Sequence, residues 1–376
     1  MCFWRLALVA GTAVILAGCG NKETKEALEK ATTLENQKQY YDATNLLVDA
    51  LKAREAKIRA DAGASADSDS TDALSKKVQS DSEILKLERA QIPLYLHMER
   101  ADMASAVYTD ILAGHPGDSV VYDSLRDKDP VIRTGAVRIL GWMGKPEAID
   151  ALAAATKDPD QDVRRAAVAA LGTIKDARTV GPLIEALKDS YWFARSEAAN
   201  ALGQEGDGRA VKPLLDAVAD PDGTVEGSAE TALLSLCKEP GAPASPDDFA
   251  GRLNDPNQKV ALISAICLAS LKDSRAVPVL VKLVSSPDQI TRLGAVKGLG
   301  ETGDPSVIPT LRQTLKDSDA NMRGWSIIGL GNLKDQGSLA DLQALAADDT
   351  QLASIRAAAA AAVSKITGQA PTSNAP

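Results

Sequence analysis

Residues 158–188 read DPDQDVRRAAVAALGTIKDARTVGPLIEALK, and the chain repeats a version of this stretch at an interval of 31 residues. The interval is clearest in a column of leucines, which is interrupted once by a spacing of 35 residues: Leu140, Leu171, Leu202, Leu233, Leu268, Leu299 and Leu330. Glycine usually follows this leucine, and we expect it to end a helix because glycine tolerates the left-handed conformation there: Gly141, Gly172, Gly203, Gly300 and Gly331.

Each unit contains the signals for two helices. Asp158 and Pro159 suit the N-cap and the first position of a helix that ends near Leu171. A second helix follows Asp176, with Pro182 close to its start. Because a single hairpin cannot bury its apolar face, stacked hairpins are expected, and a column of alanines would let them approach closely: Ala136, Ala167, Ala198, Ala229 and Ala295. The predicted fold is an all-α solenoid.

The repeat pattern D-P-x(3)-V-R-x-x-A-x(3)-L-G, followed by D-x-R-x-V-x-P-L, resembles HEAT-like repeats, in particular the short variety named after phycobilin lyases. The resemblance covers residues 118–366 and implies a solenoid of helical hairpins. It does not imply one function, because such repeats serve many purposes. Lyase activity is implied only by the name of the repeat variety.

The sequence divides into four expected segments. A signal peptide covers residues 1–18, a helical region with a flexible loop at 59–72 covers 19–116, the solenoid covers 117–367, and a disordered tail covers 368–376. In the helical region, the order of apolar and small residues around Tyr40 and Ala43 resembles a tetratricopeptide hairpin, although an unrelated helical pair is an equal alternative.

The first residues resemble the signal of a bacterial lipoprotein. Arg5 precedes an apolar run that is too short to span a bilayer, and this run ends in Leu16-Ala17-Gly18-Cys19. The resemblance implies that Cys19 is acylated. It also implies that the protein is not retained in the inner membrane, because Gly20 rather than Asp follows this cysteine, so we expect the outer membrane, facing the periplasm. The alternative is an ordinary signal peptide with a chance cysteine.

Composition narrows the range of functions. The formal net charge of −9 argues against a nucleic-acid partner, which would require a basic surface. The two histidines, His97 and His115, have no carboxylate pattern around them, and the sequence has no His-Glu pair of the kind that metal-binding HEAT-like hydroxylases use. We therefore predict no catalytic residues, no metal and no cofactor.

A column of arginines allows two interpretations, a binding stripe or a structural ladder: Arg133, Arg164, Arg195, Arg292, Arg323 and Arg356. The HEAT-like pattern favours the ladder, with acidic partners expected at the turn between the helices of a hairpin: Asp176, Asp207, Asp273, Asp304 and Asp335. Tyr191, Trp192 and Phe193 lie where three rings cannot all face inward, and they are candidates for partner binding or for packing.

Cys237 and Cys267 occupy different positions of consecutive repeats, separated by more than one helical turn. We expect two buried free thiols, with a disulfide as the alternative.

The arginine and glycine columns of the repeat are both interrupted between residues 226 and 269. Glu226 and Ala261 replace the arginine, Leu234 and Ala269 replace the glycine, and the segment KEPGAPASPDD at 238–248 is inserted. Its prolines predict that the second helix starts late, near residue 247. We expect a hinge here with fast hydrogen exchange at 225–253, while simple drift of one repeat is the alternative.

The function expected from these features is a membrane-anchored, non-enzymatic scaffold or adaptor that binds an unidentified protein in the bacterial cell envelope, as a monomer. The rival hypothesis is an enzyme or a small-ligand-binding subunit that uses the solenoid groove or the inserted segment.

Overall fold

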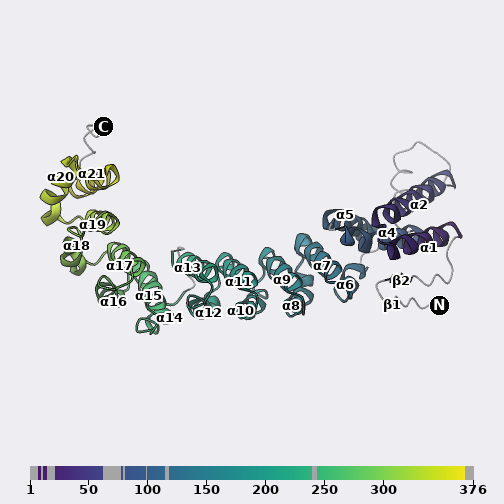
Figure 1. The fold of residues 1–376 in the computed structure, drawn as a ribbon, viewed down its shortest axis with the longest axis horizontal. Helices are drawn as coiled ribbons and strands as arrows, with labels where there is room; N and C mark the ends of the chain where they lie inside the picture. The colour runs from purple at the N-terminus through teal and green to yellow at the C-terminus, as the bar shows by residue number, and fades with distance from the viewer. Residues whose placement is uncertain are drawn as a thin grey trace. The chain divides into compact units, whose positions relative to one another are not determined.

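The computed structural model describes residues 7–9, 12–14, 22–61, 78, 81–98, 100–114, 118–238 and 244–368. Within these ranges the elements are helices, apart from the antiparallel three-residue strands β1 (Ala7–Val9) and β2 (Thr12–Val14) (Figure 1). The chain forms two compact units, Met1–Pro182 and Leu183–Pro376. The fold is the predicted all-α solenoid. None of the described helices is both long enough and apolar enough to cross a membrane.

The first unit starts with two helical pairs and continues with the first hairpins of the array. Its helices are α1 Lys22–Asn36, α2 Tyr40–Asp61, α4 Ser82–His97, α5 Ala101–Gly114, α6 Val120–Ser124, α7 Pro130–Met143, η1 Pro146–Ala148, α8 Ile149–Ala155 and α9 Gln161–Thr173. Helix α2 continues to Asp61, so the expected loop cannot start at residue 59. Residues 62–72, His115, most of the expected signal peptide and all but Gly368 of the expected tail lie outside the described residues.

The second unit consists of further hairpins in chain order, and α10 Val180–Ala186 contains the boundary between the units. Its other helices are α11 Trp192–Glu205, η2 Gly208–Ala210, α12 Val211–Ala217, α13 Gly223–Lys238, α14 Pro246–Ala250, α15 Gln258–Ser270, α16 Ala276–Leu283, α17 Gln289–Thr302, η3 Pro305–Val307, α18 Ile308–Thr314, α19 Ala320–Asn332, η4 Gln336–Ser338, α20 Leu339–Ala347 and α21 Ala353–Thr367.

We call the long helix of each hairpin helix A and the shorter one helix B. The odd-numbered helices from α7 to α21 are the helices A, and each packs on the next helix A within its unit (Figure 1). The alanine column is fully buried along these helices, and the leucine column is at most 2% exposed. The apolar positions of the repeat therefore form the core, as predicted.

Helix A starts two residues later in the repeat than predicted. The N-cap of α9 is Asp160 rather than Asp158, and Asp160 accepts hydrogen bonds from the backbone N–H groups of Asp162 and Val163. The N-cap of α7 is Asp129, which occupies the same register as Asp160 one repeat earlier. Helix α9 therefore begins at Gln161, two residues later than expected. Asp158 accepts from the Asp160 N–H at 2.9 Å and remains outside the helix.

The glycines after the leucine column do not end the helices, which corrects the prediction. Gly141 and Gly203 lie inside α7 and α11, where a Cβ atom would come within 2.7 and 2.8 Å of the side chains of Ala170 and Ala232 in the next helix A. Their role is close helix packing. The left-handed residue comes three positions later and is a glycine or a lysine: Gly144, Gly206, Lys272, Gly303 and Lys334.

The inserted segment delays helix B of its repeat, as predicted. Helix α14 begins at Pro246, and the side chain of Ser245 caps it by accepting from the Asp247 N–H. Phe249 is fully buried and fixes this short helix to the core. Residues 239–243 lie outside the described residues.

Candidate functional site

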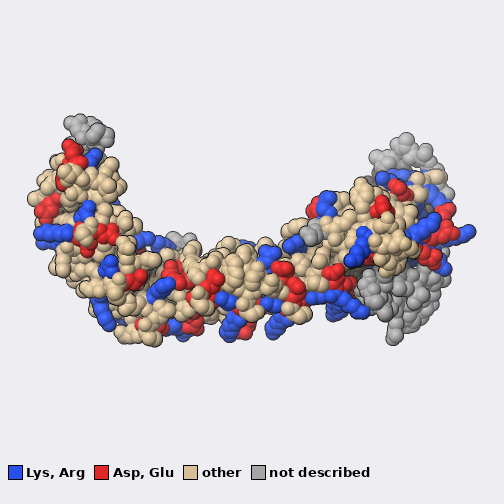
Figure 2. All heavy atoms as spheres, in the orientation of Figure 1, with Lys and Arg blue, Asp and Glu red and all other residues tan. Residues whose placement is uncertain are grey.

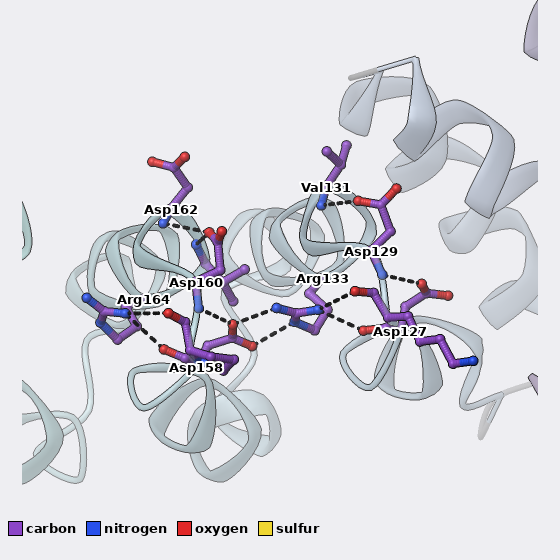
Figure 3. A network of polar contacts seen from close by, with 11 residues as sticks. Asp127, Asp129, Val131, Arg133, Asp158, Asp160, Asp162 and Arg164 are labelled. Carbon is purple, nitrogen blue, oxygen red and sulfur yellow. Dashed lines mark hydrogen bonds and ion pairs between the residues drawn. The ribbon is translucent and has the colours of Figure 1, made fainter. Parts of the chain in front are cut away.

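Two arginines of the column, Arg133 and Arg195, bind an aspartate of the next repeat through one side of the guanidinium and backbone carbonyls of their own repeat through the other. Arg133 donates from Nε and Nη2 to both carboxylate oxygens of Asp158, each at 2.7 Å (Figure 3). Its Nη1 donates to the backbone carbonyls of Asp127 and Lys128, which lie just before its own helix. The guanidinium therefore ties the start of its own helix A to the loop that precedes the next helix A.

The second unit contains the same arrangement. Arg195 donates to Asp220 at 2.7 and 2.8 Å, and its Nη1 donates to the carbonyls of Asp189 and Ser190. The bond to the preceding carbonyls also occurs at Arg164, as Figure 3 shows, and at other column members: Arg292, Arg323 and Arg356. Arg323 also donates to the Gln351 side-chain amide at 3.2 Å. The shared feature is therefore the backbone contact, and the partner in the next repeat varies.

The expected acidic partners were wrong. In three repeats the aspartate at the turn between the helices binds the arginine two residues later: Asp176 with Arg178, Asp207 with Arg209, and Asp273 with Arg275. Asp304 accepts from the Ser306 N–H, and Asp335 binds Arg312. These carboxylates begin the turn into helix B and are occupied by neighbouring donors. The partner of the arginine column precedes the next helix A instead.

The ion pairs of the arginine ladder are largely buried, and each charged group in them is paired with an opposite charge. The side chains of Arg133 and Asp158 are only 12% and 11% exposed. Burial opposes the ionisation of Asp158, but the Arg133 guanidinium and the Asp160 N–H together hold the pKa of this carboxyl below its ordinary value. A partner would have to break these bonds to reach the charges. The geometry therefore favours a structural role over a binding stripe.

The aromatic residues at 191–193 occupy the start of α11. Tyr191 is the N-cap residue, but its side chain makes no cap hydrogen bond, whereas Asp129, Asp160, Asp288 and Asp319 cap their helices. The rings contact one another in sequence, with 5.1 Å between the centroids of Trp192 and Phe193. Trp192 is 38% exposed, and the other two rings are half-buried. This helix therefore has aromatic surface in the place of a capping carboxylate.

Other helices A also expose apolar side chains at their start. Val131 and Ile290 are the second residues of α7 and α17, and Leu352 is the N-cap residue of α21 without a side-chain bond. They are 39%, 74% and 59% exposed. We call these residues and Trp192 the apolar edge residues. They lie at neighbouring positions of the repeat, the N-cap and the first two residues of helix A.

A shallow cavity in the first unit begins at one apolar edge residue. It has a volume of 240 Å³, and Val131 and Leu96 form part of its apolar wall. Arg138, Asp160 and Arg165 line it on the polar side. Basic and acidic side chains are also interspersed over the visible face of both units (Figure 2). A wall of both apolar and charged groups suits a peptide segment better than a small apolar ligand.

His97 lies close to two carboxylates that are distant from it in the sequence, Glu35 and Asp129. Its ring stacks on Tyr40 with 4.6 Å between centroids, and its Nε2 lies 3.4 Å from Asp129. Glu35 lies 3.9 Å from Nδ1, which is also 3.0 Å from the Pro93 carbonyl. These groups come from α1, α2, α4 and the start of α7, so only the folded chain places them together. The cluster joins the N-terminal helices to the first hairpin of the array.

We expect Glu35 to make the stability of the first unit depend on pH. Burial, with a smaller contribution from Asp127, raises the pKa of Glu35 to about 7. The folded state therefore holds this proton more tightly than the unfolded state, and stability should fall as the pH rises from about 4.5 to about 7. Glu35→Gln should reduce this fall and raise the free energy of unfolding above pH 7 by about 1–3 kcal/mol.

Urea unfolding of the full chain at several pH values between 5 and 8 tests this prediction. Glu29→Gln is the matched control, because Glu29 is an exposed carboxylate of the same helix. If the Glu35 variant and the wild type lose the same stability between pH 5 and pH 8, Glu35 does not titrate in this range.

The two cysteines of the second unit lie together, although their repeat positions predicted a separation. The Sγ atoms of Cys237 and Cys267 are 2.8 Å apart, and both side chains are buried free thiols. Sequence register failed here because α13 continues to Lys238, beyond the point where α11 and α17 end in a left-handed glycine. Cys19 lies outside the described residues. Among the described residues, no group of three or more His, Cys, Asp or Glu side chains is arranged to hold a metal ion.

Comparison with known proteins places the hairpins in a family. A model described as HEAT repeats matches residues 151–234, 247–318 and 308–373, and a model described as a PBS lyase HEAT-like repeat matches 132–158. No curated protein shows significant similarity to the chain.

Solved structures resemble the chain at low sequence identity. A structure of Kap95p with RanGDP is 12% identical with a TM-score of 0.55, and the match covers 94% of this chain and 54% of that one. The Escherichia coli protein YibA is 19% identical with a TM-score of 0.45, covering 67% and 93%. The CpcE–CpcF complex of phycocyanin lyase from Nostoc sp. is 20% identical with a TM-score of 0.29, covering 68% and 89%.

Proposed function

The chain belongs to the HEAT-repeat family, and from this premise we propose that it is a membrane-anchored scaffold that binds a protein partner in the bacterial cell envelope, without enzymatic activity of its own. The HEAT-repeat fold is suited to protein interaction, because stacked hairpins present a long row of equivalent positions.

The main support is the start of α11, where Tyr191 stands in place of a capping aspartate. Loss of a side-chain cap costs about 0.5–2 kcal/mol, so the fold alone favours Asp at this position. Aromatic side chains at an exposed edge are the residue type that most often supplies binding energy at protein interfaces. The other apolar edge residues extend this type of surface to other repeats.

The anchor is proposed from the sequence Leu16-Ala17-Gly18-Cys19. Acyl chains on Cys19 would hold the chain at a membrane, because each buried methylene contributes about 0.8 kcal/mol and two or more chains make the anchor stable. We propose the outer membrane, facing the periplasm, since Gly20 follows the lipidated residue. The same scaffold would act there as a monomer.

A pair of variants separates binding from stability at the aromatic site. Tyr191→Asp should restore the cap and raise the free energy of unfolding by about 0.5–2 kcal/mol, while it weakens partner capture from native envelopes. Trp192→Ala should also weaken capture. Trp142→Ala is the matched control, because Trp142 is 60% exposed near the other end of a helix A.

The captured proteins are compared by cross-linking the full chain in its own envelope, followed by mass spectrometry. Equal capture by Tyr191→Asp and the wild type would refute the aromatic site. The anchor is tested separately: the mature N-terminus should be an acylated Cys19, and Cys19→Ser should leave the membrane fraction. An unmodified residue 19 would refute the anchor without affecting the aromatic site.

A further inference from the structure

The contact between Cys237 and Cys267 occurs where the repeat packing changes. At the register of Cys267, α7 has Ile139, but the helices A from α9 to α19 other than α15 have alanine or glycine: Ala170, Ala201, Ala232, Gly298 and Gly329. These small residues allow close approach to a glycine of the preceding helix A, as at Gly203 and Ala232. Helix α13 has Leu234 at the glycine position, so α15 cannot approach it as closely as α13 approaches α11. The larger Cys267 side chain fills the remaining space.

Cys237 reaches this space because α13 is longer than the other helices A. Cys237 lies in its last turn, at the register where α11 and α17 have left-handed Gly206 and Gly303. The Sγ of Cys237 lies 3.0 Å from the Leu233 carbonyl and 2.8 Å from the Sγ of Cys267. A covalent disulfide is about 2.05 Å long, so the sulfurs must approach by less than about 1 Å.

We propose that Cys237 and Cys267 are a redox-responsive pair, whose oxidation to a disulfide locks the end of α13 to α15. The bond would join two consecutive repeats across 30 residues of sequence. This closed loop contains α14 and residues 239–245, in which the repeat pattern is interrupted. The inference does not depend on the anchor or on the aromatic site.

The oxidant in this proposal is an external disulfide, and the reaction is two thiol–disulfide exchanges. The Cys237 thiolate attacks one sulfur of the oxidant and forms a mixed disulfide with it, while the other sulfur of the oxidant leaves as a thiolate and takes up the proton that Cys237 lost. The Cys267 sulfur then attacks the Sγ of Cys237, gives up its proton, and releases the second half of the oxidant as a thiol. Two protein thiols become one disulfide, and the external disulfide becomes two thiols.

The environments of the two thiols suit this order. Contact with Cys267 holds the pKa of Cys237 below its ordinary value, whereas burial raises the pKa of Cys267 well above it. Cys237 is also nearer the helix end, where fraying of the last turn can expose it to an oxidant. Cys237 is therefore the attacking thiol, and Cys267 resolves the mixed disulfide.

The experiment treats the folded full chain with oxidised glutathione, blocks the remaining thiols and digests with trypsin. We expect a cross-linked pair of the peptides 210–238 and 260–272, lighter than their sum by two hydrogen atoms. The peptides identify the bond separately from any reaction of Cys2 or Cys19. Cross-linking that requires denaturant, or glutathione that stays attached to separate cysteines, would overturn the pairing.

Hydrogen exchange measures the lock itself. Oxidation should slow exchange at residues 225–253 by about tenfold or more relative to the reduced chain, because the bond restricts the opened state. Cys267→Ala is the control, since alanine is the residue of other repeats at this register; it should show no change with oxidised glutathione. An oxidised wild type that exchanges as fast as the reduced chain would overturn the lock even if the bond forms.

Discussion

Arg195→Ala is expected to lower the free energy of unfolding by about 2–4 kcal/mol, because it removes two bonds to Asp220 and leaves that carboxylate buried without its cation. The side chains of Arg195 and Asp220 are 14% and 10% exposed, so water replaces the lost bonds poorly. The carbonyls of Asp189 and Ser190 lose a donor at the same time. The loss should appear as an earlier urea midpoint for the repeats around α11 and α13.

The control for this prediction is an exposed arginine–aspartate ion pair with a similar distance between the charged groups. Arg209 binds Asp207 at 2.7 Å, but its side chain is 56% exposed, so Arg209→Ala should leave the midpoint almost unchanged. If both variants shift the urea midpoint equally, the buried ion pair contributes no more to stability than the exposed one. If Arg195→Ala abolishes partner capture without loss of stability, the arginine column is a binding stripe after all.

Gly203→Ala is expected to destabilise the second unit by about 1–3 kcal/mol, although alanine favours helices more than glycine does. A Cβ at Gly203 would lie 2.8 Å from both the Cα and the Cβ of Ala232. Because one of these atoms belongs to the backbone, the clash cannot be relieved by a side-chain rotation. Helices α11 and α13 would have to separate along their contact.

The opposite sign is expected for a glycine in open space. Gly227 lies in α13, and a Cβ atom added there would have no neighbour within 4 Å, so Gly227→Ala should stabilise by about 0.5–1 kcal/mol. Urea unfolding of both variants checks the pair of predictions. A stabilising Gly203→Ala would show that helix propensity outweighs close packing, and that α11 and α13 can move apart at little cost.

The sequence predicted the periodic features of the fold, because those depend on local spacing. The column of leucines located the helices A from α7 to α19, and the prolines of the inserted segment located the late start of α14. Two roles were misassigned because several local roles fit the same residue. The sequence around Gly203 fits a helix-ending glycine, but the structure shows that this glycine makes room for Ala232. The sequence around Asp158 fits an N-cap, but in the structure Asp160 is the N-cap.

The contacts between repeats could not be predicted in the same way. Asp220 lies 25 residues after Arg195, and only the stacking of consecutive hairpins shows that it, rather than Asp207, is the partner. The distance between Cys237 and Cys267 depends on the extra length of α13 and on the wider spacing at Leu234. Glu35 and His97 likewise meet only because α1 and α4 pack together.

The ladder also has a consequence for how such a gene can change length. Arg133 and Asp158 are 25 residues apart, as are Arg195 and Asp220, so each bond fits inside one 31-residue period. Deletion of one whole period removes one arginine and one aspartate and leaves the remaining arginine at the same distance from the next aspartate. Duplication adds a complete bond in the same way. Recombination between repeats of the gene can therefore shorten or lengthen the protein by whole hairpins, whereas an insertion of another length, such as the segment at 238–248, changes the spacing between neighbouring repeats.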